Sequence, residues 1–306
     1  MSHDDARRLT GVRPSAIAGT WYPGTKSDLE ETVDDFLAHA PFYPTDDELI
    51  ALISPHAGYP YSGQTAACAY RQLAGRRYDV VVLLGPSHYD NFGPLAITSE
   101  QYYATPLGQV ELAQDFIAAL AGQVSLVRVD RDREHSLEIQ LPFLQRTLSP
   151  GPQADRTPQD FKLVPIMVML PFYLFGAQML EPCERVAAAL ADLSQNRRIL
   201  IVASSDLSHL PDYAAVEKFD ARTAELVESF DLPELAQYMW ESGECRACGD
   251  APILITLLTA RKLGAGRARV LHRTNSGEVT GMRIPGQYTV GYMAAAVYKS
   301  KGENRN

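Results

Sequence analysis

Short runs of apolar residues, many of them β-branched, constrain the fold of this chain more than any other feature. Three such runs cover residues 49–53, 80–84 and 199–202, and none of them contains a polar side chain. Strands without a polar face lie in a sheet that is covered on both sides, and helical patterns alternate with these runs along the chain. The sequence therefore predicts an α/β fold of three layers, with helices on both faces of a central mixed, mostly parallel sheet.

The domain organisation follows from the continuity of this alternation. Strand and helix patterns run from residue 13 to residue 298 without an internal repeat, a low-complexity tract or a linker-like segment. We therefore expect a single α/β domain over residues 13–298. The polar ends, residues 1–12 and 299–306, are expected to be disordered.

Composition excludes several classes of function. The chain has 28 basic and 37 acidic side chains, a net charge of −9, whereas nucleic-acid binding needs a basic surface. No apolar run approaches the ~20 residues of a membrane-spanning helix, and the N-terminus lacks the pattern of a signal peptide. Four cysteines are too few for a disulfide framework. We expect a cytoplasmic protein that binds neither nucleic acid nor a membrane.

The placement of the histidines points to a shared pocket. Five of the seven histidines follow apolar runs, namely His56, His88, His135, His209 and His272. In an open α/β sheet, the carboxyl ends of the strands form the crevice where ligands bind. Imidazole is the commonest metal ligand and titrates near neutral pH. The placement therefore predicts a pocket for metal binding or for acid–base chemistry.

Two of these histidines share the same local pattern. His56 lies in the segment 54–63, where proline and glycine tighten a loop between an apolar run and a helical pattern, and His88 ends the segment 85–88 after a second run. Small residues let the backbone approach a ligand closely. A single histidine at a strand end is more often structural, but two with matching surroundings favour a shared function.

A third motif lies at the start of the clearest predicted helix, over residues 132–148. Glu134, His135 and Glu138 fall in its first turn, where His135 and Glu138 share a face. Acidic residues there also suit the helix dipole, so the glutamates have a structural explanation that His135 lacks. The helix is predicted from leucines at helical spacing, namely Leu137, Leu141, Leu144 and Leu148.

Two motifs remain. One, with Asp206 and His209, follows the third apolar run, and the other, with Cys245 and Cys248, precedes the last helical pattern. Asp206 and His209 are either a carboxylate that orients an imidazole or a helix cap with a nearby histidine. Cys245 and Cys248 form a Cys-x-x-Cys pair, but a structural zinc site usually needs a second pair. Alternatively Cys248 alone matters, as a thiolate whose pKa is lowered at a helix N-terminus. Cys68 and Cys183 fit a buried apolar core.

Seven motifs together resemble the Memo family, in the same order and over about residues 15–298. They are residues 18–23, 55–63, 84–88, 105–108, 134–143, 204–209 and 248–249. The resemblance implies the fold of the class III extradiol dioxygenases of the LigB type, which are non-haem iron enzymes. It also implies that cysteine replaces the carboxylate ligand of those enzymes. Cys245 departs from the family pattern as an additional thiol.

Carried over to this chain, the resemblance implies His56, His88 and Cys248 as metal ligands. It implies Asp206 and His209 as residues of the pocket, and His135 as an acid–base residue; we expect these three to be catalytic. A thiolate with two imidazoles favours Fe(II) or copper, with zinc as a further option. His272 receives no role and is expected to be structural.

Three functions remain open at this point. The first is a redox enzyme that depends on non-haem iron or copper and acts on a small molecule or a modified residue. The second is a non-enzymatic module that binds a peptide or protein in the former dioxygenase cleft, with Trp21, Tyr22, Tyr59 and Tyr61 as its lining. The third is a zinc-dependent hydrolase. The resemblance to the AmmeMemoRadiSam system also implies AMMECR1-like and radical-SAM proteins as partners.

Overall fold

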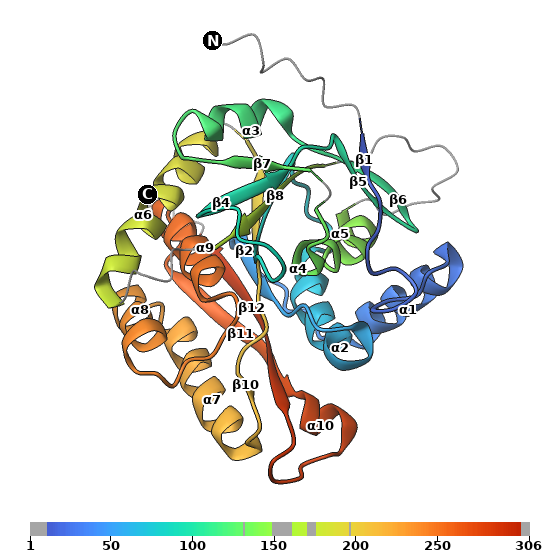
Figure 1. The fold of residues 1–306 in the computed structure, drawn as a ribbon, viewed down its shortest axis with the longest axis vertical. Helices are drawn as coiled ribbons and strands as arrows, with labels where there is room; N and C mark the ends of the chain where they lie inside the picture. The colour runs from blue at the N-terminus through green and yellow to red at the C-terminus, as the bar shows by residue number, and fades with distance from the viewer. Residues whose placement is uncertain (1–10, 131, 149–160, 170–175, 196, 301–306) are drawn as a thin grey trace.

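The computed structural model describes residues 11–130, 132–148, 161–169, 176–195 and 197–300 (Figure 1). Most of the predicted disordered ends, residues 1–10 and 301–306, lie outside the described residues. Val12 belongs to a short strand, β1 (Val12–Arg13), and Lys299 ends the last strand.

The three apolar runs form neighbouring strands at the centre of a large sheet. They are β2 (Glu48–Ser54), β3 (Val80–Pro86) and β9 (Ile199–Ser204), and a fourth strand, β8 (Lys162–Val168), lies beside β3. These strands run parallel in the order β2-β9-β3-β8. All of their residues except Glu48 and Lys162 are buried, as strands covered on both faces require.

Antiparallel pairs extend the sheet on both sides. On one side β12 (Thr289–Lys299) pairs with β2, and β10 (His209–Leu210) and β11 (Arg267–Asn275) pair with β12. On the other side β4 (Leu95–Thr98) runs antiparallel to β8, and β7 (Val127–Val129) lies parallel to β4. A small separate sheet joins β1 to β5 (Tyr102–Thr105) and β6 (Gly108–Glu111).

Helices cover both faces of the large sheet, which confirms the predicted α/β class and its mixed, mostly parallel sheet (Figure 1). One face carries α1 (Lys26–His39), α2 (Tyr59–Tyr70), α4 (His135–Glu138) and α5 (Leu141–Leu148). The other carries α3 (Gln114–Ala121), α6 (Leu180–Leu193), α8 (Leu232–Glu241) and α9 (Asp250–Lys262). Helix α7 (Tyr213–Ser229) packs on β11 and β12, and α10 (Ser276–Thr280) lies between these two strands in the sequence. Among the described residues, short 3-10 helices cover Arg71–Leu73 and Gly176–Met179.

The helix predicted over residues 132–148 is in fact two helices, α4 and α5, and this part of the prediction is wrong. Pro142 has no N–H to donate to the carbonyl of Glu138, and its ring crowds that carbonyl, which accounts for the interruption between the two helices. The side chain of Gln140 uses the break: its Nε2 donates to the Pro55 carbonyl at 2.9 Å and to Ser204 Oγ at 2.8 Å. The break therefore ties α4 to the ends of β2 and β9.

Within the described ranges, the structure contains no helix that combines the length and the apolar character needed to cross a membrane.

Candidate metal site

Three predicted site residues, His56, His88 and His135, form one cluster. Each contributes a ring nitrogen, and these nitrogens lie within 4.8 Å of one another. The ring centroids are 5.2 Å apart for His56 and His88, 4.5 Å for His88 and His135, and 5.5 Å for His56 and His135. His56 and His135 are buried, and the His88 side chain is 28% exposed. The three imidazoles could hold a metal ion.

His56 is fixed at the junction between β2 and β9. Its backbone N–H donates to Asp206 Oδ1 at 2.7 Å, and its Nδ1 lies 3.1 Å from Ser204 Oγ. Burial, together with the neighbouring His88, lowers the pKa of His56 to about 3. The imidazole is therefore neutral near pH 7, which is the form that binds a metal.

His88 is held by the carboxylate of Glu134. The backbone N–H of His88 donates to Glu134 Oε2 at 2.7 Å, and its Nδ1 lies 2.9 Å from Oε1. Burial alone would raise the pKa of Glu134, but the hydrogen bonds from His88 and from the Ser136 N–H outweigh it and lower that pKa to about 2. Because an ionised carboxylate only accepts hydrogen bonds, Nδ1 of His88 carries a proton. A neutral His88 then has a free lone pair on Nε2, as in many metal-bound histidines.

Two glycines allow the close approaches that build this cluster. A methyl group at Gly85 would lie 2.6 Å from Ser136 Oγ, so only glycine lets α4 pack against the end of β3. A methyl group at Gly249 would lie 2.6 Å from Ser205 Cβ, so glycine brings the start of α9 to the end of β9. The sequence motifs around His88 and Cys248 therefore have a steric cause.

His135 reaches the cluster from a helix and not from a strand end. Strand β7, which precedes it, runs opposite to the central strands because β4 is antiparallel to β8 and β7 is parallel to β4. The indole of Trp21 lies against the His135 ring with centroids 4.3 Å apart, and the Tyr89 hydroxyl is 3.0 Å from Nδ1. Burial lowers the pKa of His135 to about 3. The predicted acid–base histidine thus lies in the same group as two predicted ligands.

Cys248 lies beside this group, in contact with His56. Its Sγ is 3.2 Å from His56 Nε2 and 3.7 Å from the Asp206 carbonyl oxygen. The predicted lowering of its pKa is wrong for the metal-free chain: burial and the Asp206 carboxylate raise the pKa of Cys248 well above its usual value. Cys248 precedes Gly249, the N-cap of α9, and so lies outside the first turn, where the helix dipole acts.

Asp206 and His209 have separate positions in the site. Asp206 accepts from the backbone N–H groups of His56 and Ala57, and burial raises its pKa to about 6 against these hydrogen bonds. In the described contacts it makes no hydrogen bond to His209, so it does not orient that imidazole in the predicted way. Nε2 of His209 is buried and has no hydrogen-bond partner among the residues that the structure describes, and burial lowers the pKa of this histidine.

A cavity of about 580 Å³ opens onto these residues. Its lining includes all three clustered histidines with Asp206 and His209, and none of the lining residues that the structure describes is a lysine or arginine. Trp21 and Tyr61 line it as predicted. Tyr22 and Tyr59 are buried instead, and their hydroxyls donate to Glu138 and to the Ile139 carbonyl. Tyr288, Tyr292 and Met282 complete its aromatic and apolar walls.

The other singled-out residues lie outside the cavity lining. Cys245 Sγ accepts from Thr223 Oγ1 at 3.9 Å, and His272 lies within β11, where Nδ1 is 3.0 Å from Thr65 Oγ1. Cys68 and Cys183 are buried, as predicted for core residues. Tyr89 and Arg13 had no signal in the sequence, because their contacts with the 132–138 segment are set by the tertiary fold.

These features define an α/β protein with a histidine cluster beside a cavity at the carboxyl ends of its central strands. A family model described as Memo-like protein matches residues 13–296. A MEMO1 family protein of Aeropyrum pernix is 34% identical over 301 residues, covering 94% of this chain and 99% of the relative. The MEMO1 family protein of Methanosarcina barkeri is 31% identical, and the match covers 94% of this chain and 100% of the relative. That of Nitrosopumilus maritimus is 30% identical, and the match covers 88% of this chain and 94% of the relative. The chain therefore belongs to the Memo-like protein family, as the motifs predict.

Proposed function

We propose that this chain is a metal-dependent redox enzyme that uses non-haem iron or copper and acts on a small molecule or a modified residue. The observation that carries the proposal is the His56, His88 and His135 cluster at the wall of a cavity. Cys248 contacts His56 and is a further ligand candidate. The proposed ligands are thus His56 and His88, with His135 or Cys248 as the third.

The residues present suit a transition-metal ion. Two of the imidazoles are neutral near pH 7 because burial lowers their pKa values to about 3. The third is backed by the Glu134 carboxylate, an arrangement that orients metal-bound histidines in many proteins. Imidazole suits iron, copper and zinc, and a thiolate shifts the preference toward iron, copper or zinc over magnesium and calcium. Among the described residues, the cavity lining carries Asp206 and no lysine or arginine, which favours a cation.

The chain would contribute binding and proton transfer around that ion. A bound iron or copper would supply one-electron chemistry that no side chain of the site can provide. Trp21, Tyr61 and Tyr288 form walls that would exclude water from a bound substrate. His209 lines the cavity, and we propose that its imidazole exchanges a proton with that substrate. We propose His135 and Asp206 as further catalytic residues of this cavity.

A second candidate is a module that binds a peptide in the same cavity. It is supported by exposed side chains at the cavity, since Tyr61, Met282 and Tyr288 are 48%, 45% and 59% exposed. Such a rim could receive an apolar segment of a partner, and AMMECR1-like or radical-SAM proteins are the proposed partners.

Metal content and oxygen dependence test these functions. The protein is purified without chelators, and bound metal is measured in the parent and in the variants His56→Ala and Cys248→Ala. His39→Ala is the matched control, because its side chain is 69% exposed on α1. We expect the control to keep the parent's metal content and His56→Ala to lose it. Unchanged metal content in both site variants would show that the assignment is wrong.

Activity separates the classes once metal is found. Substrate turnover that requires O₂ supports the redox enzyme, whereas turnover that persists without oxygen supports a zinc hydrolase. Saturable peptide binding that survives removal of the metal supports the binding module.

A further inference from the structure

Arg13 is a buried cation next to the proposed metal site, and no part of the proposed function uses it. It lies in β1 with an exposed fraction of 1%, and it does not line the cavity. Burial would lower its pKa, but Tyr103, Asp132 and Glu138 raise that pKa above the ordinary value, so the guanidinium is charged. A buried charge of this kind needs partners that satisfy it.

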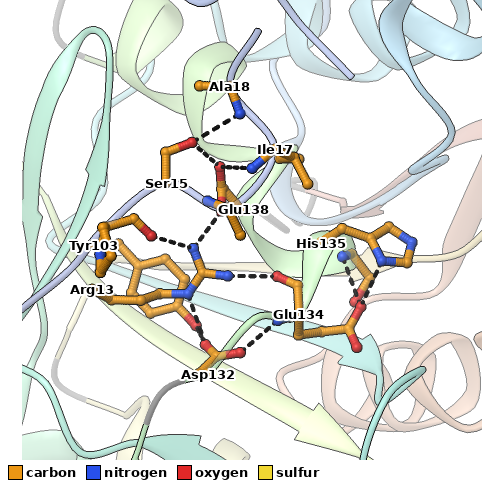
Figure 2. A network of polar contacts seen from close by, with 12 residues as sticks. Arg13, Ser15, Ile17, Ala18, Tyr103, Asp132, Glu134, His135 and Glu138 are labelled. Carbon is orange, nitrogen blue, oxygen red and sulfur yellow. Dashed lines mark hydrogen bonds and ion pairs between the residues drawn. The ribbon is translucent and has the colours of Figure 1, made fainter. Parts of the chain in front are cut away.

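Apart from the Pro14 carbonyl, which lies 3.2 Å from Nη1, the hydrogen-bond partners of the Arg13 side chain belong to the segment that carries His135 (Figure 2). Nε donates to Asp132 Oδ2 at 3.0 Å, Nη1 donates to the carboxylate of Glu138, and Nη2 donates to the Glu134 carbonyl at 2.9 Å. These partners lie 119 to 125 residues away in the sequence. The guanidinium thus joins the N-terminal strand to α4 and to the residues before it.

This network fixes the backbone of Glu134 from both sides. Asp132 uses its second oxygen, Oδ1, to accept from the Glu134 N–H at 2.7 Å, while Arg13 holds the Glu134 carbonyl. The side chain of Glu134 then accepts from the backbone and from Nδ1 of His88. His135 is the next residue along the chain. The orientation of two clustered histidines therefore depends on the same ion pair.

Other residues of the N-terminal segment support the same helix. Glu138 accepts from the backbone N–H of Ala16 at 2.8 Å and from the hydroxyls of Ser15 and Tyr22 at 2.5 and 2.7 Å. Trp21 lies against the ring of His135. Residues 13–22 therefore contact both ends of α4, at Glu138 and at His135.

We propose that Arg13 is a positioning residue of the metal site, which acts through Asp132 and Glu134 to set the tautomer and place of His88 and the place of His135. The inference rests on the proposed function for its relevance to metal binding. Lysine cannot replace arginine here, because its single ammonium cannot donate in the fixed planar directions that reach three separate groups. Charge alone is therefore insufficient, and this distinguishes positioning from simple neutralisation of the acidic pair.

The test uses Arg13→Lys, which keeps the charge, and Arg146→Lys as the matched control. Arg146 of α5 also makes a two-point pair, with Asp34 of α1, but it does not contact Glu134. The first readout is a proton–nitrogen correlation spectrum of the histidine side chains in metal-free protein, assigned with His88→Ala. The second is the affinity for Co²⁺ alone, followed by visible absorption in competition with a chelator.

We expect Arg13→Lys to lose the single Nδ1-protonated form of His88 and to bind Co²⁺ about 10- to 100-fold more weakly, the usual effect of removing support behind a metal ligand. Arg146→Lys should match the parent in both readouts. Should Arg13→Lys fail to fold, Tyr103→Phe replaces it, since it removes a hydroxyl that donates to Asp132 and leaves the ring beneath the guanidinium. That variant should show smaller changes in the same direction.

An unchanged His88 spectrum together with an unchanged affinity in the folded Arg13 or Tyr103 variant would overturn the inference. If the parent itself binds no Co²⁺, the proposed metal function is wrong. In that case the spectrum of the metal-free protein still decides whether Arg13 sets the state of His88.

Discussion

The proposed metal site has two sides that are built in different ways. On the strand side, His56 and Asp206 follow β2 and β9, and the parallel pairing of these strands brings them together. On the α4 side, Glu134 and His135 are held by Arg13 and Trp21, which come from the N-terminal segment. The strand side depends on sheet topology, whereas the α4 side depends on buried charges that are distant in sequence.

This difference predicts unequal sensitivity to the loss of a charge. We expect Arg13→Met to destabilise the protein by about 3–5 kcal/mol, because it leaves Asp132 and Glu138 buried without their cation. On the strand side, Asp206→Asn should cost under about 1 kcal/mol, because its amide oxygen can still accept from the His56 N–H. Urea unfolding monitored by circular dichroism measures both changes in free energy.

Arg146→Met controls for the loss of any arginine pair. Its partly exposed ion pair with Asp34 should be worth about 0–1 kcal/mol. Equal losses for Arg13→Met and Arg146→Met would remove the distinction between the two sides.

The contact between the two sides can be tested at Gly85, where α4 packs against the end of β3. Gly85→Ala should cost about 1–3 kcal/mol, because the added methyl group collides with Ser136. It should also weaken metal binding by displacing α4. Gly266→Ala is the control, since a methyl group there meets no atom within 4 Å. The same urea experiment measures both variants, and a cost at Gly85 no larger than at Gly266 would contradict the close packing.

Acid sensitivity should differ in sign between His135 and Asp206, one residue from each side. The pKa of His135 is lowered to about 3 in the folded chain, so protonation favours the unfolded state and stability falls as pH drops below about 6.5. The pKa of Asp206 is raised to about 6, so its protonation favours the folded state as pH drops through that value. Between pH 6 and 4, the free energy of unfolding should therefore fall less steeply with decreasing pH in His135→Asn than in the parent. In Asp206→Asn it should fall more steeply than in the parent.

Each of these slope changes should approach about 1.4 kcal/mol per pH unit, the value for one proton. The measurement is the free energy of unfolding of metal-free protein at a series of pH values. Parallel pH profiles for parent and variants would show that neither group titrates in the predicted direction.

The same contrast explains what could be predicted from the sequence. The central strands and the positions of His56 and His88 follow from local apolar runs and from the rule that parallel strand ends share one edge of a sheet. The break before α5 also had a local signal, because Pro142 lies within the predicted helix. The fold class was predictable for these reasons, and the family was predictable from the seven motifs.

The α4 side was less predictable because its causes are not local. His135 reaches the cluster although β7 runs against the central strands. The raised pKa of Cys248 comes from burial and from Asp206, which a helix-dipole argument on the sequence omits. Arg13 meets partners more than a hundred residues away, and no spacing pattern reports such a contact.

In the proposed site, His56 and His88 hold one metal ion, with His135 or Cys248 as the third ligand. A crystal structure of protein purified without chelators, with anomalous scattering recorded at the absorption edges of iron, copper and zinc, tests it most directly. We expect one anomalous peak in contact with His56 and His88, and with His135 or Cys248 as the third ligand. A metal peak bound elsewhere, with the clustered histidines in contact only with one another and with water, would contradict the proposed site.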